Sequence, residues 1–534
     1  MRPFVSSKSL IEKNMQSLLS IDREISKSYS SLAHTRTYED AITLLNTLQA
    51  SYRSPKARQE IIPKIPSSPN DNIRACLRLL GYEISDLNKL NILHVTGTKG
   101  KGSTCAYAES ILNQYRLSLN VPLKIGLYTS PHLISVRERI RINSVSIARD
   151  NFTKYFFQVW DCLESAPTID GSSKPLEKIG YFRFLTLLSY HTFMQQDVNV
   201  AIYEVGVGGE NDSTNVVEAP VATGISIIGI DHTAALGSTI QEIAWHKAGI
   251  MKKDCPNFTV EQESEAMEII QKRAVERHVK SCCVVETLPQ LEAVRIQPDM
   301  PFQRRNASLA VYLADTALRR VCSRYSHHLS VSKPLPPQII AGLEQVVWRG
   351  RCEKKEEESI TWYLDGAHNA TSAGVAAAWF ASEISRVENA NMQVNSGFVK
   401  SGLRVLIFNQ QGKRDIMALL ETMFSNTKAN NIQFDHVIFC PTVPSGTNVR
   451  KDSVNASMDP IAIKELRDQT AFADRWIELD PSGAKPYVLA SLDESLSLCR
   501  KLSLEHSEKC HVFITGSIHL VGRALEILEG VDSL

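Results

Sequence analysis

The stretch TGTKGKGST at residues 96–104 concentrates the residue types that bind phosphate groups. Its three glycines let backbone N–H groups point together at an anion, and a helix that begins here adds partial positive charge. Lys101 can neutralise phosphate oxygens, and the hydroxyl of Ser103 can face a phosphate or its Mg²⁺. Because an apolar run precedes the stretch and small residues follow it, the sequence predicts a phosphate-binding turn between a strand and a helix.

The general phosphate-loop pattern, GxxxxGK followed by Ser or Thr, is not met here. Val95 stands where the pattern has its first glycine, and Gly102 stands where it has a hydroxyl residue. A glycine-rich connection with surface lysines is therefore an alternative interpretation. The preceding strand, the following helix and the hydroxyls of Ser103 and Thr104 favour phosphate binding over this alternative.

Polar side chains also follow three other predicted strands. They are Ser130 after 123–129, Glu204 after 199–203, and Asp231 with His232 after 221–230. Open α/β sheets bind ligands at the carboxyl ends of their strands, and a Mg²⁺ already held by phosphates needs few protein ligands. Taken singly, these side chains also fit a helix cap, a surface ion pair and a hydrogen-bonded turn histidine. Taken together at three strand ends, they favour a metal site.

The elements that must position these residues alternate between strands and helices. Strands are predicted at NILHVTG, LKIGLYTS, NVAIYEVG and VATGISIIGI, and helices at YEDAITLLNTLQ, after Lys101, at YFRFLTLLSYHTFMQ and at TIQEIAWHKAGI. Their short connections predict a mostly parallel, doubly wound α/β sheet. After PPQIIAGLEQVVWRGRCE the alternation restarts, with strands at TWYLDGAHN, LRVLIFNQ, FDHVIFCP and HVFITGS.

Two α/β domains of unequal size follow from this pattern. We expect an N-terminal arm at 1–36, a large phosphate-loop domain at 37–345, a linker at 346–353 and a smaller C-terminal domain at 354–534. The polar stretch 386–402 is expected to be a surface insertion.

Composition bounds the partners of the chain. Its 534 residues are 43% hydrophobic and 22% charged with a net charge of +1, so we expect no nucleic-acid partner. No apolar run reaches the roughly 18 residues of a membrane span. Eleven scattered cysteines without metal-binding spacing favour reduced thiols and a cytoplasmic location. The start MRPFVSSKSL resembles a mitochondrial presequence, which leaves a mitochondrial form open.

A series of motifs resembles those of the eukaryotic folylpolyglutamate synthase branch of the Mur-ligase superfamily. In chain order they are TGTKGKGST, SPHLISVRERIRIN, EVGVGGENDSTN, GIDHTAALGSTIQEIAWHKAGI, FQRRNASLA, WRGRCE, DGAHNATS and VFITGSIHLVGRALE. The resemblance spans roughly residues 38–530 and is weakest at 386–402 and in parts of 253–300. It implies a Mur-ligase-like fold with a Rossmann-like C-terminal domain that carries the glutamate-ligase function.

The resemblance implies a role for each motif. The residues it places at ATP are Gly97, Thr98, Gly100, Lys101, Gly102, Ser103, Gln303, Asn306, Arg351, Asp365 and His368. The implied metal ligands are Ser130, Glu204, His232 and Lys247, the last as a carbamate, which forms only from a neutral amine. The implied catalytic residues are Lys101, His232, Lys247 and Arg351, and the implied folate contacts are Pro131, His132 and Arg139.

Three positions depart from the family's motifs. Phe302 replaces a usual His, which leaves the nucleotide contacts of that helix to Gln303 and Asn306. Ala370 replaces Pro. His246 stands where bacterial relatives often have Glu, and we do not expect it to bind metal.

The implied activity is an ATP-dependent amide ligation. A carboxylate of (poly)glutamyl tetrahydrofolate would take the γ-phosphate to give an acyl phosphate, and the amine of L-glutamate would displace phosphate to form the γ-linked product. Mg²⁺ and a monovalent cation are the expected ions, and a monomer is the expected state. Lys99 and GENDSTN resemble enzymes dedicated to chain extension. Dihydrofolate synthase, the sister activity, and a catalytically silent ATP-binding protein stay open as alternatives.

Overall fold

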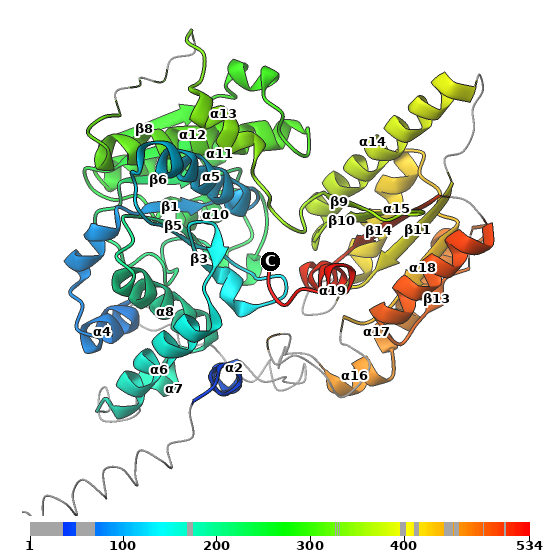
Figure 1. Cartoon of the computed structure of the whole chain (residues 1–534), viewed down its shortest axis with the longest axis horizontal. Coiled ribbons are helices and arrows are strands. Elements are labelled where there is room, and N and C mark those ends of the chain that lie inside the picture. The colour runs from blue at the N-terminus through cyan, green and yellow to red at the C-terminus, as the bar shows by residue number, and fades with distance from the viewer. Residues whose placement is uncertain are drawn as a thin grey trace, which may run out of the picture.

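Two sheets in two bodies organise the chain. The computed structural model describes residues 36–49, 70–167, 175–325, 327, 329, 332–395, 402–410, 416–442, 452, 459–483, 485–506 and 509–534. Figure 1 shows one body coloured blue to green and a second coloured yellow to red. The predicted arm at 1–36 lies outside the described residues except for Arg36. Among the helices described, none has the length and apolar character needed to cross a membrane.

The first sheet has eight strands in the order β4-β3-β2-β5-β1-β6-β7-β8. They are β1 (Leu93–Thr96), β2 (Ile125–Tyr128), β3 (Ile140–Ile142), β4 (Val145–Ser146), β5 (Val200–Glu204), β6 (Ala222–Ile225), β7 (Pro256–Val260) and β8 (Ser281–Val285). The strands from β2 to β8 in this order run parallel, whereas β3 and β4 form an antiparallel edge. Parallel neighbours need crossover connections, which the alternating sequence pattern predicts.

Helices cover both faces of this sheet. They are α2 (Tyr38–Thr47), α4 (Asp71–Leu79), α5 (Lys101–Leu119), α6 (Arg149–Ser165), α7 (Pro175–Ile179), α8 (Tyr181–Gln195), α9 (Thr233–Leu236), α10 (Ile240–Ala248), α11 (Ser264–Glu276), α12 (Pro301–Val321) and α13 (Pro337–Glu344), with 3-10 turns η1 (Ile84–Leu90), η2 (Val136–Arg139) and η3 (Pro289–Ala293). Tyr128 and Tyr203 pack with α2, α4, α6 and α8, whereas Val95 and Ile202 pack with α5, α12 and α13. The strands thus alternate between two apolar layers, which confirms the predicted doubly wound fold.

The second sheet has six strands in the order β13-β12-β11-β14-β10-β9. They are β9 (Glu353–Glu356), β10 (Ile360–Leu364), β11 (Leu403–Phe408), β12 (His436–Phe439), β13 (Tyr487–Val488) and β14 (Cys510–Thr515). Its helices are α14 (Ala370–Asn395), α15 (Ile416–Ala429), α16 (Pro460–Lys464), α17 (Arg467–Leu479), α18 (Leu492–His506) and α19 (Ile518–Glu529). Five strands are parallel and β9 is antiparallel at the edge, so this body is also an α/β layered domain.

Two predicted elements differ from the structure. The strand predicted at 221–230 ends at Ile225, because the residues after Ser226 hydrogen-bond to the glycine-rich turn instead of a sheet neighbour. Ser226 N–H donates to the carbonyl of Thr96, and Thr98 N–H donates to the carbonyl of Ile227. Within the stretch expected to be an insertion, residues 386–395 continue helix α14 and 396–401 lie outside the described residues.

The segment after β2 joins the two bodies. Ile134 is buried in the apolar cluster of the second body, among residues of β10, β11, β14 and α19. A Cβ on Gly522 of α19 would lie 2.1 Å from the carbonyl oxygen of Leu133, so glycine permits this close approach. The carboxylate of Glu138 accepts the N–H groups of Leu133 and Leu534. Residues 133–138 therefore belong to the first body by chain order and to the second by packing.

A buried carboxylate on α5 gives the fold a pH dependence. Glu109 accepts the N–H of Ser144 at 2.9 Å, and burial raises the pKa of its carboxyl from 4.5 to about 7. Between these two pH values the folded chain holds a proton that the unfolded chain has released. The free energy of unfolding should therefore fall by roughly 3 kcal/mol in all as the pH rises through this range.

We therefore expect Glu109→Gln to raise the thermal unfolding midpoint relative to the natural chain at about pH 8 and much less at about pH 5. Scanning calorimetry at both pH values measures this difference. Glu268→Gln, at an exposed position on α11, serves as the control. An equal effect of Glu109→Gln at both pH values would contradict the assignment.

Candidate active site

The glycine-rich turn connects β1 to α5 as predicted. Gly97 and Gly100 have φ angles of 145° and 86°, a region that L side chains rarely adopt, and Lys101 begins the helix. The Lys101 ammonium donates to the carbonyl oxygens of Gly97 at 3.1 Å and Thr98 at 3.4 Å. Its charge therefore lies over the turn, where the helix N-terminus adds partial positive charge.

Residues beyond β6 hold the turn in shape. Ser226 Oγ donates to the carbonyl of Lys99 at 2.7 Å, and Thr98 Oγ1 donates to the carbonyl of Gly229 at 2.9 Å. A Cβ on Gly97 would lie 1.9 Å from Ser226 Oγ, so no other residue fits there without displacement. The positions predicted to contact ATP thus form a pre-shaped loop.

Lys247 lies on α10 and reaches the same turn. Its Nζ donates to the carbonyl oxygen of Gly97 at 2.8 Å, so two lysines share one acceptor. Burial, and next to it the charge of Lys101, holds the pKa of Lys247 well below its usual range. The neutral amine is therefore easier to reach here than on an exposed lysine.

Glu204 ends β5 beside β1, where it pairs with Val95. Its carboxylate accepts the N–H of Ser130 at 3.0 Å, so two of the predicted metal residues are in contact. Burial raises the pKa of Glu204, while Lys101, the Ser130 N–H and Arg351 act in the opposite direction. The positive charges of the turn lysine and of the linker arginine therefore both act on the pKa of this carboxylate.

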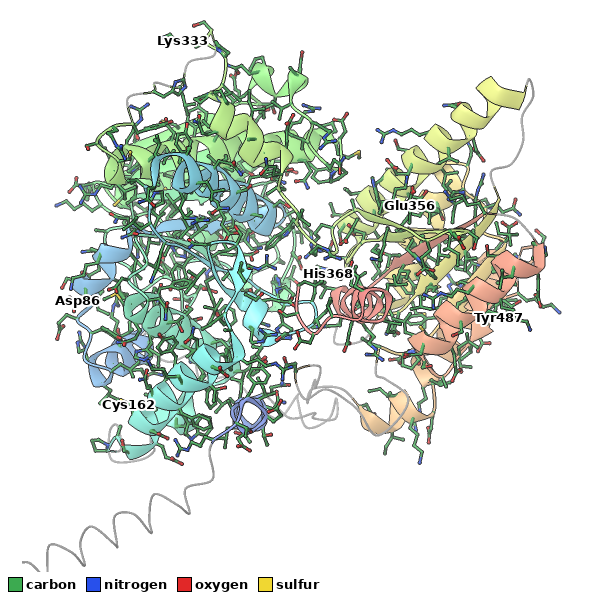
Figure 2. The ribbon with its side chains drawn as sticks, viewed as in Figure 1. Asp86, Cys162, Lys333, Glu356, His368 and Tyr487 are labelled. Carbon is green, nitrogen blue, oxygen red and sulfur yellow. The ribbon has the colours of Figure 1, made fainter. Side chains whose placement is uncertain are left out.

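Arg351 joins the site to the second body. Its Nη1 donates to the carbonyl oxygen of Gly366 at 3.3 Å, and its charge opposes the rise that burial causes in the pKa of Asp365. His368 follows in the same loop, with Nδ1 2.8 Å from the Gly366 carbonyl, and Figure 2 shows it at the boundary between the two bodies. The loop after β10 therefore faces the first body.

Helix α12 closes the other side of the turn. Gln303 and Asn306 are both buried, and Asn306 Nδ2 donates to Gln303 Oε1 at 3.1 Å. A Cβ on Gly100 would lie 2.2 Å from Asn306 Oδ1, which shows how closely the amide approaches the turn. Both residues therefore lie on the helix that packs against the turn, and their contact with a nucleotide stays a prediction.

The residues predicted to face the folate divide into two kinds. Arg139 Nε donates to Nδ1 of His132 at 2.9 Å, and both side chains are buried. Burial, followed by the charge of Arg139, lowers the pKa of His132 well below its usual range. Pro131 is exposed. The buried pair places a positive charge close to Glu204, whose pKa it also lowers.

His232 is the predicted ligand that the structure leaves most open. It is exposed, has a φ of 53°, and donates its N–H to Asp231 Oδ1 at 2.8 Å. Within the described residues, no group of three or more His, Cys, Asp or Glu side chains could hold a metal ion. The predicted set contains only Glu204 and His232 of these types, so any metal here needs oxygen donors from elsewhere.

Two contacts at the turn were missed by sequence reasoning. Trp348 of the linker covers Gly102, where a Cβ would lie 3.0 Å from its ring, and Arg141 lies 5.6 Å from that ring. Lys99 Nζ lies 3.6 Å from Asp231 Oδ2. Lys99 was noted in the sequence, but no spacing rule predicts that it contacts Asp231. No spacing rule predicts the contact of Trp348 with Gly102 either.

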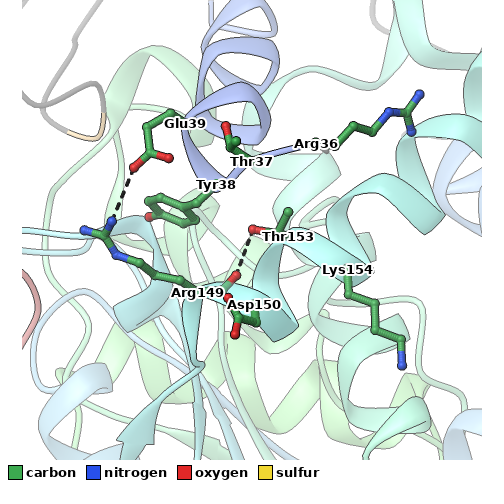
Figure 3. Close-up of a pocket in the computed structure, with 8 residues that line it drawn as sticks. All are labelled: Arg36, Thr37, Tyr38, Glu39, Arg149, Asp150, Thr153 and Lys154. Carbon is green, nitrogen blue, oxygen red and sulfur yellow. Dashed lines mark hydrogen bonds and ion pairs between the residues drawn. The ribbon is translucent and has the colours of Figure 1, made fainter. Parts of the chain in front are cut away.

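A cavity of about 530 Å³ opens outside this site, between the start of α2 and α6. Figure 3 shows Arg149 of this cavity directed at Glu39, 3.3 Å away, and Thr153 bonded to the Arg149 carbonyl. Arg149 also pairs with Asp532, and Arg36 pairs with Asp161. Because the arginine charges are balanced within the chain, we assign no ligand to this cavity.

Comparison with known proteins identifies the family. The folylpolyglutamate synthase of Neurospora crassa is 45% identical over 509 residues, which cover 93% of this chain and 93% of that protein. The chain belongs to the folylpolyglutamate synthase family. The family that the motifs resembled is thereby confirmed, although a comparison with family models found no match.

Solved structures of folylpolyglutamate synthases share the fold of this chain. One is folylpolyglutamate synthase of Mycobacterium tuberculosis complexed with ADP and AMPPCP, with 22% identity and a TM-score of 0.64, covering 88% of this chain and 96% of that one. Another is the bifunctional folylpolyglutamate synthase/dihydrofolate synthase of Yersinia pestis complexed with AMPPNP and Mn ion. It is 19% identical with a TM-score of 0.61 and covers 91% of this chain and 98% of that one.

The fit of Asn306 against the turn can be tested by substitution. Gly100 and Gly81 have φ angles of 86° and 83°, but a Cβ on Gly81 meets nothing within 4 Å. Alanine at either position costs about 1–2 kcal/mol for the backbone alone. We expect Gly100→Ala to lower the thermal unfolding midpoint several degrees more than Gly81→Ala, because only the former displaces Asn306.

Adding Asn306→Ala to Gly100→Ala should recover most of that difference in midpoint. Circular dichroism melts of the single and double variants measure it. Equal midpoints for Gly100→Ala and Gly81→Ala would show that the contact is not restrictive.

Proposed function

We propose that this chain uses ATP to add L-glutamate in γ-linkage to (poly)glutamyl tetrahydrofolate through an acyl phosphate. Membership of the folylpolyglutamate synthase family supports the reaction class. The observation that carries the proposal is the position of Glu204, whose pKa responds to Lys101 from the turn and to Arg351 from the linker. A buried carboxylate that both cations influence is a suitable neighbour for phosphate oxygens and their metal.

The turn would hold the triphosphate. Gly97, Thr98, Gly100, Gly102 and Ser103 would present N–H and hydroxyl groups, and Lys101 would neutralise the β- and γ-phosphates. Gln303 and Asn306, buried against the turn, would contact the nucleotide from α12. Asp365 and His368 would contact it from the second body. The M. tuberculosis relative complexed with ADP and AMPPCP supports a nucleotide at this fold.

The donors near Glu204 fit a hard divalent cation. Its buried carboxylate, the hydroxyl of Ser130 and the imidazole of His232 offer few ligands, which suits Mg²⁺ held mainly by phosphates and water. The relative from Y. pestis binds Mn ion, which supports a divalent metal. When bound, Mg²⁺ would neutralise charge on the transferred phosphoryl group.

Lys247 would extend this donor set as a carbamate. Carbamylation needs a neutral amine, and the lowered pKa of Lys247 favours that form. The product carries a carboxylate, which would compensate the positive charge of Lys101 that shares the Gly97 carbonyl with it.

The chemistry divides between positioning and charge. A substrate carboxylate oxygen attacks the γ-phosphorus and ADP leaves, while Lys101 and Arg351 neutralise the phosphoryl oxygens. The amine of L-glutamate then attacks the acyl carbon, phosphate leaves, and the new amide nitrogen loses a proton. The Arg139–His132 pair, buried beside this site, would hold the anionic end of the folate substrate.

We propose a cytoplasmic monomer as the working form. All eleven cysteines are free in the structure, which supports a reducing compartment. A mitochondrial form is compatible with the same chemistry.

The substrate is decided by supplying tetrahydrofolate or dihydropteroate with glutamate and ATP and weighing the products. We expect tetrahydrofolate and its polyglutamates to gain glutamate units. Because the Y. pestis relative is a bifunctional folylpolyglutamate synthase/dihydrofolate synthase, dihydropteroate must be tested as the second substrate. Gain from dihydropteroate alone would support dihydrofolate synthase, and no gain from either would support a silent ATP-binding protein.

The carbamate is tested with Lys247→Ala. We expect this variant to lose at least about 100-fold of the glutamate-addition rate, because a metal-side carboxylate and a buried charge partner are both removed. Added formate, a small carboxylate, should restore part of that rate. Lys253→Ala, which alters an exposed lysine nearby, should change neither the rate nor the response to formate. A Lys247→Ala enzyme that formate does not affect would contradict the carbamate.

A further inference from the structure

A chain of polar contacts joins the phosphate-binding turn to the second body through one carboxylate. Lys99 Nζ of the turn lies 3.6 Å from Oδ2 of Asp231, which follows β6. Asn369 Nδ2, in the loop between β10 and α14, donates to the same oxygen at 2.9 Å. Three segments, separated by more than a hundred residues each, therefore meet at Asp231.

The orientation of Asn369 is determined by its own loop. Its Oδ1 accepts the N–H of Ser372 at 3.0 Å and the hydroxyl of Ser372 at 2.8 Å. Because a backbone N–H can only donate, the amide oxygen must face Ser372 and the amide nitrogen must face Asp231. The contact with the first body is thus specified by geometry within the second.

The carboxylate of Asp231 is suited to the contact. Its side chain is only 13% exposed, and its other oxygen accepts the N–H of His232 at 2.8 Å. The carboxylate forms an ion pair with Lys99 and accepts a charge-assisted hydrogen bond from the oriented amide of Asn369, which is stronger than a neutral one. The pairing also fixes Lys99 next to Gly100 and Lys101, where the phosphates would lie.

We propose that Asp231 is a positioning residue that couples the nucleotide turn to the second body and thereby keeps the two bodies closed during the reaction. This inference rests on the proposed function, because closure matters only if a reactive intermediate forms. Asn369 would hydrogen-bond Asp231 only when the two bodies are closed. The ion pair with Lys99 would make the position of Asp231 depend on the conformation of the turn.

Closure has a chemical consequence that can be measured. The bond between the acyl carbon and the phosphate oxygen is broken either by the neutral amine of glutamate, giving amide and hydrogen phosphate, or by water, giving carboxylate, hydrogen phosphate and a proton. Each route releases one phosphate, but only the first consumes glutamate. The ratio of phosphate released to glutamate added therefore reports how well water is excluded.

The test compares this ratio at saturating ATP, tetrahydrofolate and glutamate. For the natural chain we expect a ratio of about one, and for Asn369→Ala a ratio at least about threefold higher, because the hydrogen bond that joins Asp231 to the second body is lost. Asn430→Ala changes an exposed amide at the end of α15 and should leave the ratio unchanged. Circular dichroism melts of both variants show that they fold.

A second pair of variants approaches Asp231 from the turn. Lys99→Met should raise the ratio, whereas Lys99→Arg retains a positive charge and should keep it near that of the natural chain. This pair also decides the matter if Asn369→Ala does not fold. A lower rate with an unchanged ratio in both Asn369→Ala and Lys99→Met would overturn the coupling. If the natural chain adds no glutamate, the proposed function itself fails, and that result is visible before any variant is measured.

Discussion

The carbonyl oxygen of Gly97 accepts hydrogen bonds from two lysines, and the rest of the site follows from that crowding. Lys101 and Lys247 reach it from α5 and α10 at 3.1 and 2.8 Å. An ammonium group on buried Lys247 would repel that of half-buried Lys101, so Lys247 must lose its charge or both lysines must have an anion beside them. The lowered pKa of Lys247 favours loss of its charge. The buried carboxylate of Glu204, whose pKa Lys101 lowers, supplies an anion for Lys101.

Two further cations, Arg351 and Arg139, also act on the carboxylate of Glu204. A triphosphate would supply anionic oxygens for Lys101 and for these arginines, so the arrangement suits ATP more than a neutral ligand. The two cations come from different parts of the chain: Arg351 from the linker, and Arg139 from the segment whose neighbour Ile134 packs into the second body. The candidate nucleotide site therefore shares residues and segments with the contact between the two bodies.

Local pattern predicted much of this architecture. The turn at 96–104, helix α8 and the strand ends at Ser130 and Glu204 were readable because each depends on residues close in sequence. The end of β6 was not, because residues 227–229 leave the sheet to hydrogen-bond a turn that lies far away in the chain. The same limit hid Trp348 above Gly102 and Asn369 at Asp231, since both contacts depend on how two bodies meet. Motif resemblance supplied roles that spacing alone could not.

The most direct measurement is a crystal structure of this chain with Mg²⁺ and AMPPCP. The account predicts phosphate oxygens within about 3.5 Å of Lys101 Nζ and of the Arg351 guanidinium, with the metal ion against Glu204. Nucleotide bound elsewhere, or bound at the turn with Glu204 and Arg351 directed away from it, would contradict the account.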